Sequence, residues 1–302
     1  MLRFSARALK WAGMFSTRTG NFPIGIRRGW SDWQKSLPAV LSWANDNGFS
    51  VVDLGRNLED AKAARQSGFH IGSLDLLEWQ GLMNADAGAR REAVERNTAF
   101  IKEACEGGTT NFFCVMLPAD PKRARRDNFT DLAESVAALV PSLEAAGGRL
   151  VIEGYPGEGA LCCTPESYRG LFEHVPSNTV GINYDPSHLL RMGIDPIRFL
   201  KEFGERVGHV HGKDCEILTD DLYEYGWEQP ATWKKNPDFG ASAWRYTVPG
   251  QGLTNWAEVF RILEAKNYNG AVSIELEDLN YNGSEEGEKA GFLASAQFLS
   301  TC

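Results

Sequence analysis

Short runs of aliphatic and β-branched residues alternate along this chain with longer stretches of helical periodicity. Eight strand-like runs follow this rhythm, and glycine, proline or polar residues bound most of them. We expect strands at residues 23–29, 50–54, 70–76, 111–117, 149–153, 179–184, 206–211 and 270–276. Strands separated by helices pair in parallel, and eight such units close a barrel.

The intervening stretches predict helices with recognisable ends. We expect them at residues 31–47, 57–66, 87–106, 128–146, from 164 onwards, at 196–203, 255–266 and 285–299. Asn128 is the expected cap of the fourth helix, and Gly147 and Gly148 are its expected end. An open doubly wound sheet is the alternative, but no G-x-G-x-x-G motif follows the first strand. The sequence thus predicts a single (β/α)₈ TIM barrel over residues 1–302.

The seventh unit carries an aromatic-rich insertion over residues 215–249. A loop of this length in a compact domain is usually functional, and after a barrel strand it lies at the active mouth. We expect a lid or substrate wall with Trp227 and Trp244 as candidate sugar contacts; a subunit interface or simple packing stays open. The insertion contains Tyr223, Tyr225, Trp227, Trp233, Phe239, Trp244 and Tyr246.

Polar side chains stand at the ends of the last four predicted strands: Glu153, Asp185, His211 and Glu275. The carboxyl ends of barrel strands converge on one mouth, where catalytic residues gather. Three carboxylates would repel one another there unless a cation lay between them. Oxygen and imidazole ligands together predict one divalent metal ion.

Composition narrows the function classes. The net charge of −9 argues against nucleic acid, and no apolar run approaches the roughly 20 residues that span a membrane. Six cysteines without a C-x-x-C pair suit a reducing compartment, so we expect a cytoplasmic protein. The first thirty residues are basic and contain no acid; we expect an N-terminal arm over residues 1–20, and a transit peptide is the alternative.

Three segments resemble motifs of the xylose isomerase-like family of sugar isomerases and epimerases, which includes ketose 3-epimerases, inosose dehydratases and endonuclease IV. They are Asp185-Pro-Ser-His188, Val207-Gly-His-Val-His-Gly-Lys-Asp214 and Val272-Ser-Ile-Glu-Leu-Glu-Asp278. The resemblance is strong over residues 149–278, and only the strand–helix rhythm supports it before that. It implies that Glu153, Asp185, His211 and Glu275 hold one ion: Mn²⁺, or Co²⁺, Mg²⁺ or Zn²⁺.

The resemblance also implies roles around the ion. His188 is expected to bind a substrate hydroxyl, and Glu158 resembles the substrate-binding glutamate of ketose 3-epimerases. Lys213 is expected to orient a carboxylate or phosphate, with a structural ion pair as the equal alternative. Period two along the strand turns His209 inward with His211, one layer deeper, so we interpret it as a core residue.

The expected chemistry is proton removal next to a carbonyl group. The ion stabilises the resulting enediolate, and Glu153 and Glu275 act as base and acid from opposite sides. An isomerase or epimerase follows, and a lyase or dehydratase acting on a keto-cyclitol or keto-glycoside is the alternative. A non-catalytic sugar-binding barrel and an abasic-site endonuclease are further hypotheses.

The chain departs from the epimerases in one motif. The stretch 213–218 lacks the arginine that follows their metal-binding histidine. We therefore expect a small sugar substrate other than a free ketohexose, such as a glycoside, a keto sugar or an inositol. The resemblance also implies a homodimer or homotetramer.

Overall fold

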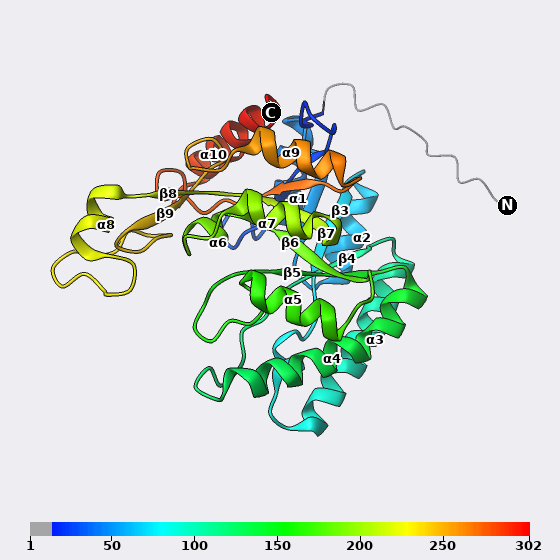
Figure 1. Cartoon of the computed structure of the whole chain (residues 1–302). Coiled ribbons are helices and arrows are strands. Elements are labelled where there is room, and N and C mark those ends of the chain that lie inside the picture. Colours follow the sequence, from blue (N-terminus) through cyan, green and yellow to red (C-terminus); the bar gives the residue numbers. More distant parts are fainter. Residues whose placement is uncertain (1–13) are drawn as a thin grey trace.

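The computed structural model describes residues 14–302. Within this range, eight parallel strands close a barrel in the order β1-β10-β7-β6-β5-β4-β3-β2, with helices packed around it (Figure 1). The strands are β1 (Ile24–Arg27), β2 (Val51–Leu54), β3 (His70–Asp75), β4 (Asn111–Val115), β5 (Arg149–Glu153), β6 (Val180–Tyr184), β7 (Val207–Gly212) and β10 (Val272–Ile274). The predicted (β/α)₈ barrel is confirmed.

Helices connect successive strands and cover the outside of the barrel. They are α1 (Leu37–Asp46), α2 (Leu58–Gln66), α3 (Ala87–Glu106), α4 (Arg125–Ala146), α5 (Pro165–His174), α6 (Pro186–Leu190), α7 (Pro196–Phe203), α9 (Trp256–Ala265) and α10 (Glu285–Leu299). Short 3₁₀ turns lie at η1 (Gln80–Met83) and η2 (Gly204–Arg206).

The core fills the barrel and the layer between strands and helices. All five residues of β6 are buried, as expected for a parallel strand covered on both faces. Trp256 of α9 and Tyr168 of α5 are each 1% exposed and pack against the strands. This packing gives a rigid frame for the side chains at the strand ends.

Two predicted helix starts are wrong. Asn128 does not cap α4, because the helix already begins at Arg125; its buried side chain instead donates to the carbonyl oxygen of Asp120 at 2.9 Å. The first helix begins at Leu37 rather than near residue 31. Ser36 caps it by accepting from the amide of Ala39, and the preceding residues form turns.

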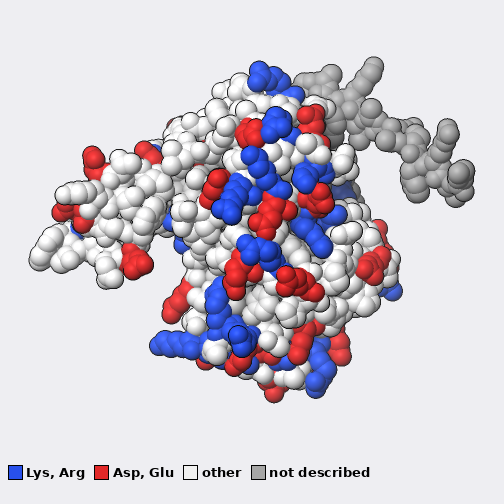
Figure 2. All heavy atoms as spheres, viewed as in Figure 1, with Lys and Arg blue, Asp and Glu red and all other residues white. Residues whose placement is uncertain are grey.

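The segment after β7 contains two short strands and a helix, and its residues 226–243 form no helix or strand. Strand β8 (Asp214–Ile217) pairs antiparallel with β9 (Trp244–Thr247), and α8 (Thr219–Tyr225) lies between them. We call residues 214–247 the arm. Figure 1 shows the arm extending away from the barrel. In Figure 2 the surface of the arm is mostly uncharged, whereas acidic and basic residues both occur over the barrel.

The predicted N-terminal arm falls only partly on the described residues, since residues 1–13 lie outside them. Residues 14–20 contact the barrel: the amide of Ile24 in β1 donates to the carbonyl oxygen of Phe15 at 3.0 Å, and Ser16 forms an isolated β-bridge with Pro23. All six cysteines are free thiols, and Cys114 is fully buried. Among residues 14–302 there is no helix with the length and apolar character of a membrane span.

Candidate metal centre

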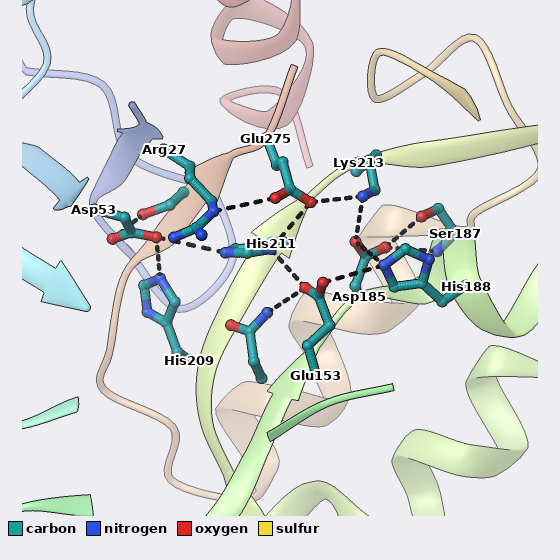
Figure 3. Close-up of polar contacts among 12 residues, drawn as sticks. Arg27, Asp53, Glu153, Asp185, Ser187, His188, His209, His211, Lys213 and Glu275 are labelled. Carbon is teal, nitrogen blue, oxygen red and sulfur yellow. Dashed lines mark hydrogen bonds and ion pairs between the residues drawn. The ribbon is translucent and has the colours of Figure 1, made fainter. Parts of the chain in front are cut away.

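The four predicted ligands lie at the carboxyl ends of adjacent strands. Glu153 ends β5, Asp185 follows β6 directly, His211 is the fifth residue of β7, and Glu275 follows β10 directly. These strands are neighbours in the barrel, so the side chains converge (Figure 3). Glu153, Asp185 and His211 are at most 5% exposed, and the side chain of Glu275 is 19% exposed.

Three carboxylates and two imidazoles meet at this point. One ligand atom from each of Glu153, Asp185, His188 and Glu275 lies within 4.8 Å of the others. Nδ1 of His211 lies 2.7 Å from Oε2 of Glu153 and 3.4 Å from Oε2 of Glu275. His188, which the sequence indicated as a substrate contact, therefore joins the three carboxylates. The expected ligand His211 lies beside them and belongs to a second group with Asp53 and His209, whose ligand atoms also lie within 4.8 Å of one another.

The two carboxylate oxygens of Asp185 have different surroundings. Its Oδ1 accepts from the amide and hydroxyl of Ser187, at 2.9 and 2.6 Å, and so caps α6. Its Oδ2 makes no well-formed hydrogen bond among the described residues, although Lys213 and His188 lie 3.2 and 3.4 Å away. A buried carboxylate oxygen in this state suits a metal ligand.

Lys213 places a positive charge among the acids. Its side chain is 1% exposed, and Nζ lies 2.5 Å from Glu275 Oε2, 2.9 Å from Glu277 Oε2 and 3.2 Å from Asp185 Oδ2. Burial alone would lower the pKa of Lys213, but the surrounding carboxylates raise it well above its ordinary value. The ion-pair alternative for Lys213 thus matches its contacts.

The two candidate acid–base residues are held as carboxylates. Burial and the mutual repulsion of the glutamates would raise the pKa of Glu153, but His211 and His188 bring it below its ordinary value. The pKa of Glu275 is also lowered, because Lys213, His211 and Arg27 outweigh its burial. Both groups are therefore ionised near neutral pH, as a base or a metal ligand must be.

A buried carboxylate that was not predicted, Asp53, lies near His211 and binds its neighbour His209. Asp53, in β2, is fully buried; its Oδ2 lies 2.7 Å from Nε2 of His209 and 3.6 Å from Nε2 of His211. Ser273 donates to its Oδ1 at 2.9 Å. Burial lowers the pKa of His211, but Glu275, Glu153 and Asp53 raise it well above its ordinary value. An acid buried in a Val-Val-Asp-Leu strand was the available signal.

Two more residues donate hydrogen bonds to the clustered carboxylates, and nothing in the sequence pattern indicated them. Asn183 of β6 donates to Glu153 Oε2 at 2.7 Å. Arg27, at the end of β1, donates to Glu275 Oε1 at 3.1 Å and to Asp75 Oδ1 at 2.9 Å. Both fix the carboxylates from strands far away in sequence.

The other predicted substrate contacts are not gathered at one place. Glu158 is exposed in the loop after β5, and Trp227 is half-exposed just beyond α8 on the arm. Trp244, on β9, packs its ring 4.4 Å from the guanidinium of Arg191 and 4.9 Å from the ring of Tyr246. Tyr246 reaches His188, so the base of the arm does contact the cluster.

A cavity of about 470 Å³ opens beside Glu275. Its wall includes Arg27, Trp30, Glu277 and, from the arm, Phe239. This volume lies within the range of roughly 300–1,000 Å³ that holds small ligands. Glu275 is the member of the cluster that lines this cavity, so the cavity adjoins the cluster on one side.

Two curated proteins are similar to this chain over part of their length. The chain is 36% identical over 165 residues to YfiH of Bacillus subtilis, covering 54% of this chain and 50% of that protein. It is 29% identical over 151 residues to inosose dehydratase of Clostridium tetani, covering 50% and 48%. The chain thus spans about half the length of the curated relatives it matches.

A solved structure has the same fold. The 3-keto-D-glucoside 4-epimerase YcjR of E. coli superposes with a TM-score of 0.65 and 18% identity, over 92% of this chain and 99% of that one. The family model of the xylose isomerase-like TIM barrel matches residues 41–302. Together with the closed barrel, this match shows that the chain belongs to the xylose isomerase-like TIM barrel family.

Proposed function

We propose that this protein is a divalent-metal-dependent sugar isomerase or epimerase that removes a proton next to a carbonyl group. One observation carries the proposal: oxygens of Glu153, Asp185 and Glu275 lie within 4.8 Å of one another at the mouth of the barrel. Nδ1 of His211 lies beside two of these carboxylates. Sugar-processing enzymes among the relatives support a small sugar or sugar derivative as substrate.

The donor set fits a divalent ion. Glu153, Asp185, His211 and Glu275 would hold it, and their three carboxylates favour Mn²⁺ or Mg²⁺, while the imidazole also suits Co²⁺ or Zn²⁺. We propose Mn²⁺. A bound ion of this kind supplies Lewis-acid stabilisation of negative charge on substrate oxygens.

The residues themselves move and hold protons. Glu153 and Glu275 both lie close to Nδ1 of His211. We propose that one of them takes the proton from carbon and that the other returns one on the opposite face. His188 and Lys213 supply N–H donors that hold substrate oxygens in place. We propose that Glu158, Trp227 and Trp244 contact the rest of the sugar.

A lyase or dehydratase is the second candidate. The match to inosose dehydratase favours it, although that match spans half of the chain. The same base would act first, and the difference lies in a leaving group on the carbon β to the carbonyl. Product mass separates the two candidates, because only the lyase reaction loses water or an aglycone.

We also propose two roles for the arm. Phe239 lines the cavity beside Glu275, which supports a lid. Tyr223 and Trp233 are more than 90% exposed, which supports contact with a second copy in a dimer or tetramer. Replacing both with serine should lower the mass in solution measured by light scattering, and an unchanged mass would exclude this contact.

We propose a cytoplasmic location, where six free thiols stay reduced. Fractionation of cells with an antibody to the protein tests it. Recovery of the protein from an oxidising compartment, with disulfides formed, would contradict this location.

The decisive experiment measures hydrogen exchange at carbon. The Mn²⁺-loaded protein is incubated in D₂O with keto sugars, 3-keto-glucosides and inososes, and mass spectrometry follows the products. We expect deuterium next to the carbonyl, loss of exchange with a chelator, and no exchange with Glu153→Gln. Retained exchange in the chelated protein, or no exchange with any compound, contradicts the proposal.

A further inference from the structure

His188 faces the metal centre with one nitrogen and the arm with the other. Nε2 lies 3.2 Å from Glu153 Oε1 and 3.4 Å from Asp185 Oδ2. Nδ1 lies 2.7 Å from the hydroxyl of Tyr246 on β9. His188 is 1% exposed, so each of its nitrogens must find its partner inside the protein.

The contact with Tyr246 of the arm determines which nitrogen of His188 carries the hydrogen. Arg191 donates from Nη1 to the oxygen of Tyr246, and a guanidinium group can only donate. The phenol hydrogen then points to Nδ1 of His188, which accepts it. The neutral imidazole must therefore carry its hydrogen on Nε2, facing the carboxylates.

The opposite tautomer leaves a group unsatisfied. With hydrogen on Nδ1, both His188 and Arg191 would donate to the same phenol oxygen. The hydroxyl hydrogen of Tyr246, which is 4% exposed, would then have no acceptor in the contacts found among residues 14–302. Buried polar groups are rarely left in this state.

We propose that Tyr246, held by Arg191, is a positioning residue that keeps Nε2 of His188 protonated. This inference rests on the proposed function and deepens it. His188 then donates a hydrogen bond to a substrate oxygen instead of ligating the ion. His211, whose Nε2 faces Asp53 and whose Nδ1 faces Glu153, is the imidazole ligand.

The assignment makes the arm part of the reaction site. Strand β9 carries Tyr246, and Lys213 lies 4.6 Å over its ring, so the same phenol touches two groups that face the substrate. A rearrangement of the arm would break the contact between Tyr246 and His188. The donor would then lose its fixed tautomer.

The tautomer is read directly by ¹H–¹⁵N NMR of ring-labelled protein, loaded with Mg²⁺ and also metal-free. The chain has five histidines, and a His188→Gln variant assigns the signals of His188. We expect a protonated Nε2 and an unprotonated Nδ1 in the parent protein, and a mixture of tautomers in Tyr246→Phe. A protonated Nδ1 in the parent protein, or no change in Tyr246→Phe, overturns the proposal.

Tyr184→Phe is the matched control. Its hydroxyl is equally buried but donates to the carbonyl oxygen of Pro196, away from His188. We expect this variant to leave the tautomer of His188 unchanged. A similar shift in both variants would mean that the change reflects general loosening, and the proposal would fail.

Mn²⁺ titration provides the second measurement, which does not need Tyr246→Phe to fold. We expect His211→Gln to bind Mn²⁺ at least about 10-fold more weakly, and His188→Gln to bind it within about 3-fold of the parent protein. A loss in His188→Gln equal to that in His211→Gln overturns the assignment. Failure of the parent protein to bind any divalent ion contradicts the proposed function instead, since the tautomer is still read from the metal-free spectra.

Discussion

Nζ of Lys213 lies 2.5 Å from Oε2 of Glu275, and the same ammonium group reaches Oδ2 of Asp185 at 3.2 Å. Both carboxylates are candidate ligands of the metal ion. The ammonium group therefore neutralises them, and it would compete with a divalent ion for the same oxygens. We therefore expect Lys213 to link the stability of the barrel mouth to its affinity for a divalent ion.

Lys213→Met should destabilise the metal-free protein by about 3–5 kcal/mol, because it leaves buried carboxylates without their partner. The loss should be smaller in Mn²⁺, since the ion then compensates the same charges. Thermal unfolding with chelator and with Mn²⁺ measures both. Lys266→Met, which removes an exposed pair with Glu205, is the control and should cost less than about 1 kcal/mol. An equal loss with and without Mn²⁺ would refute the competition.

Glu153→Gln and Glu275→Gln should each lower turnover by about 10²–10⁴-fold or more, because an amide accepts no proton from carbon. Circular dichroism should show an intact fold. Glu202→Gln is the control and should keep near-normal turnover: its side chain is 39% exposed, pairs with Arg169 and lies outside the candidate metal-binding group. A near-normal rate in Glu275→Gln would show that the acid–base assignment is wrong.

Asp53→Asn should weaken Mn²⁺ binding by about 10–100-fold, because the carboxylate that faces Nε2 of His211 is lost. Isothermal titration measures the affinity. Asp214→Asn removes another buried carboxylate, one that binds Thr254 and Trp256, and should lower stability without a comparable loss of affinity. Equal affinities in Asp53→Asn and the parent protein would mean that His211 needs no such support.

The metal-free protein should lose stability when the pH rises above about 6.5, the ordinary pKa of histidine. The folded pKa of His211 is raised, so its contribution is complete below 6.5 and is lost as the pH rises through the folded value. Mn²⁺ should reduce this loss because it replaces the proton on Nδ1. The unfolding midpoint between pH 5 and 9, with and without chelator, measures it.

At acid pH the stability should fall as the pH decreases. The folded pKa values of Glu153 and Glu275 are lowered, so their contribution is present above about 4.3 and is lost as the pH falls below it. In His211→Gln the unfolding midpoint should no longer fall as the pH rises above about 6.5, but it should still fall at acid pH. An unchanged alkaline side in that variant would contradict the assignment to His211.

The positions of Glu153, Asp185, His211 and Glu275 at strand ends could be predicted because each follows a run of β-formers. The parallel strands of a barrel have their carboxyl ends at one mouth, so the predicted fold was enough to predict that these four side chains lie together. The cap expected at Asn128 failed for a local reason. Its side chain bonds to the loop before the helix rather than to the first turn.

The partners of Asp53 and Tyr246 could not be predicted from the chain alone. Asp53 lies 156 residues from His209, its closest partner, and the pattern around it indicates only a buried strand. Tyr246 meets His188 because β9 folds back antiparallel on β8. Such contacts depend on side-chain direction and packing, which sequence periodicity does not encode.

The sequence by itself determined the barrel and the acids at its mouth, because periodicity and strand-end polarity are local properties of the chain. The family was indicated by the resemblance of three motifs. The tertiary structure decided how those groups are charged and oriented. Lys213 among the acids, Asp53 beside His211, and Tyr246 beside His188 are contacts between distant segments. Hydrogen-bond direction and pKa depend on groups a few ångströms away in space, whatever their separation along the chain.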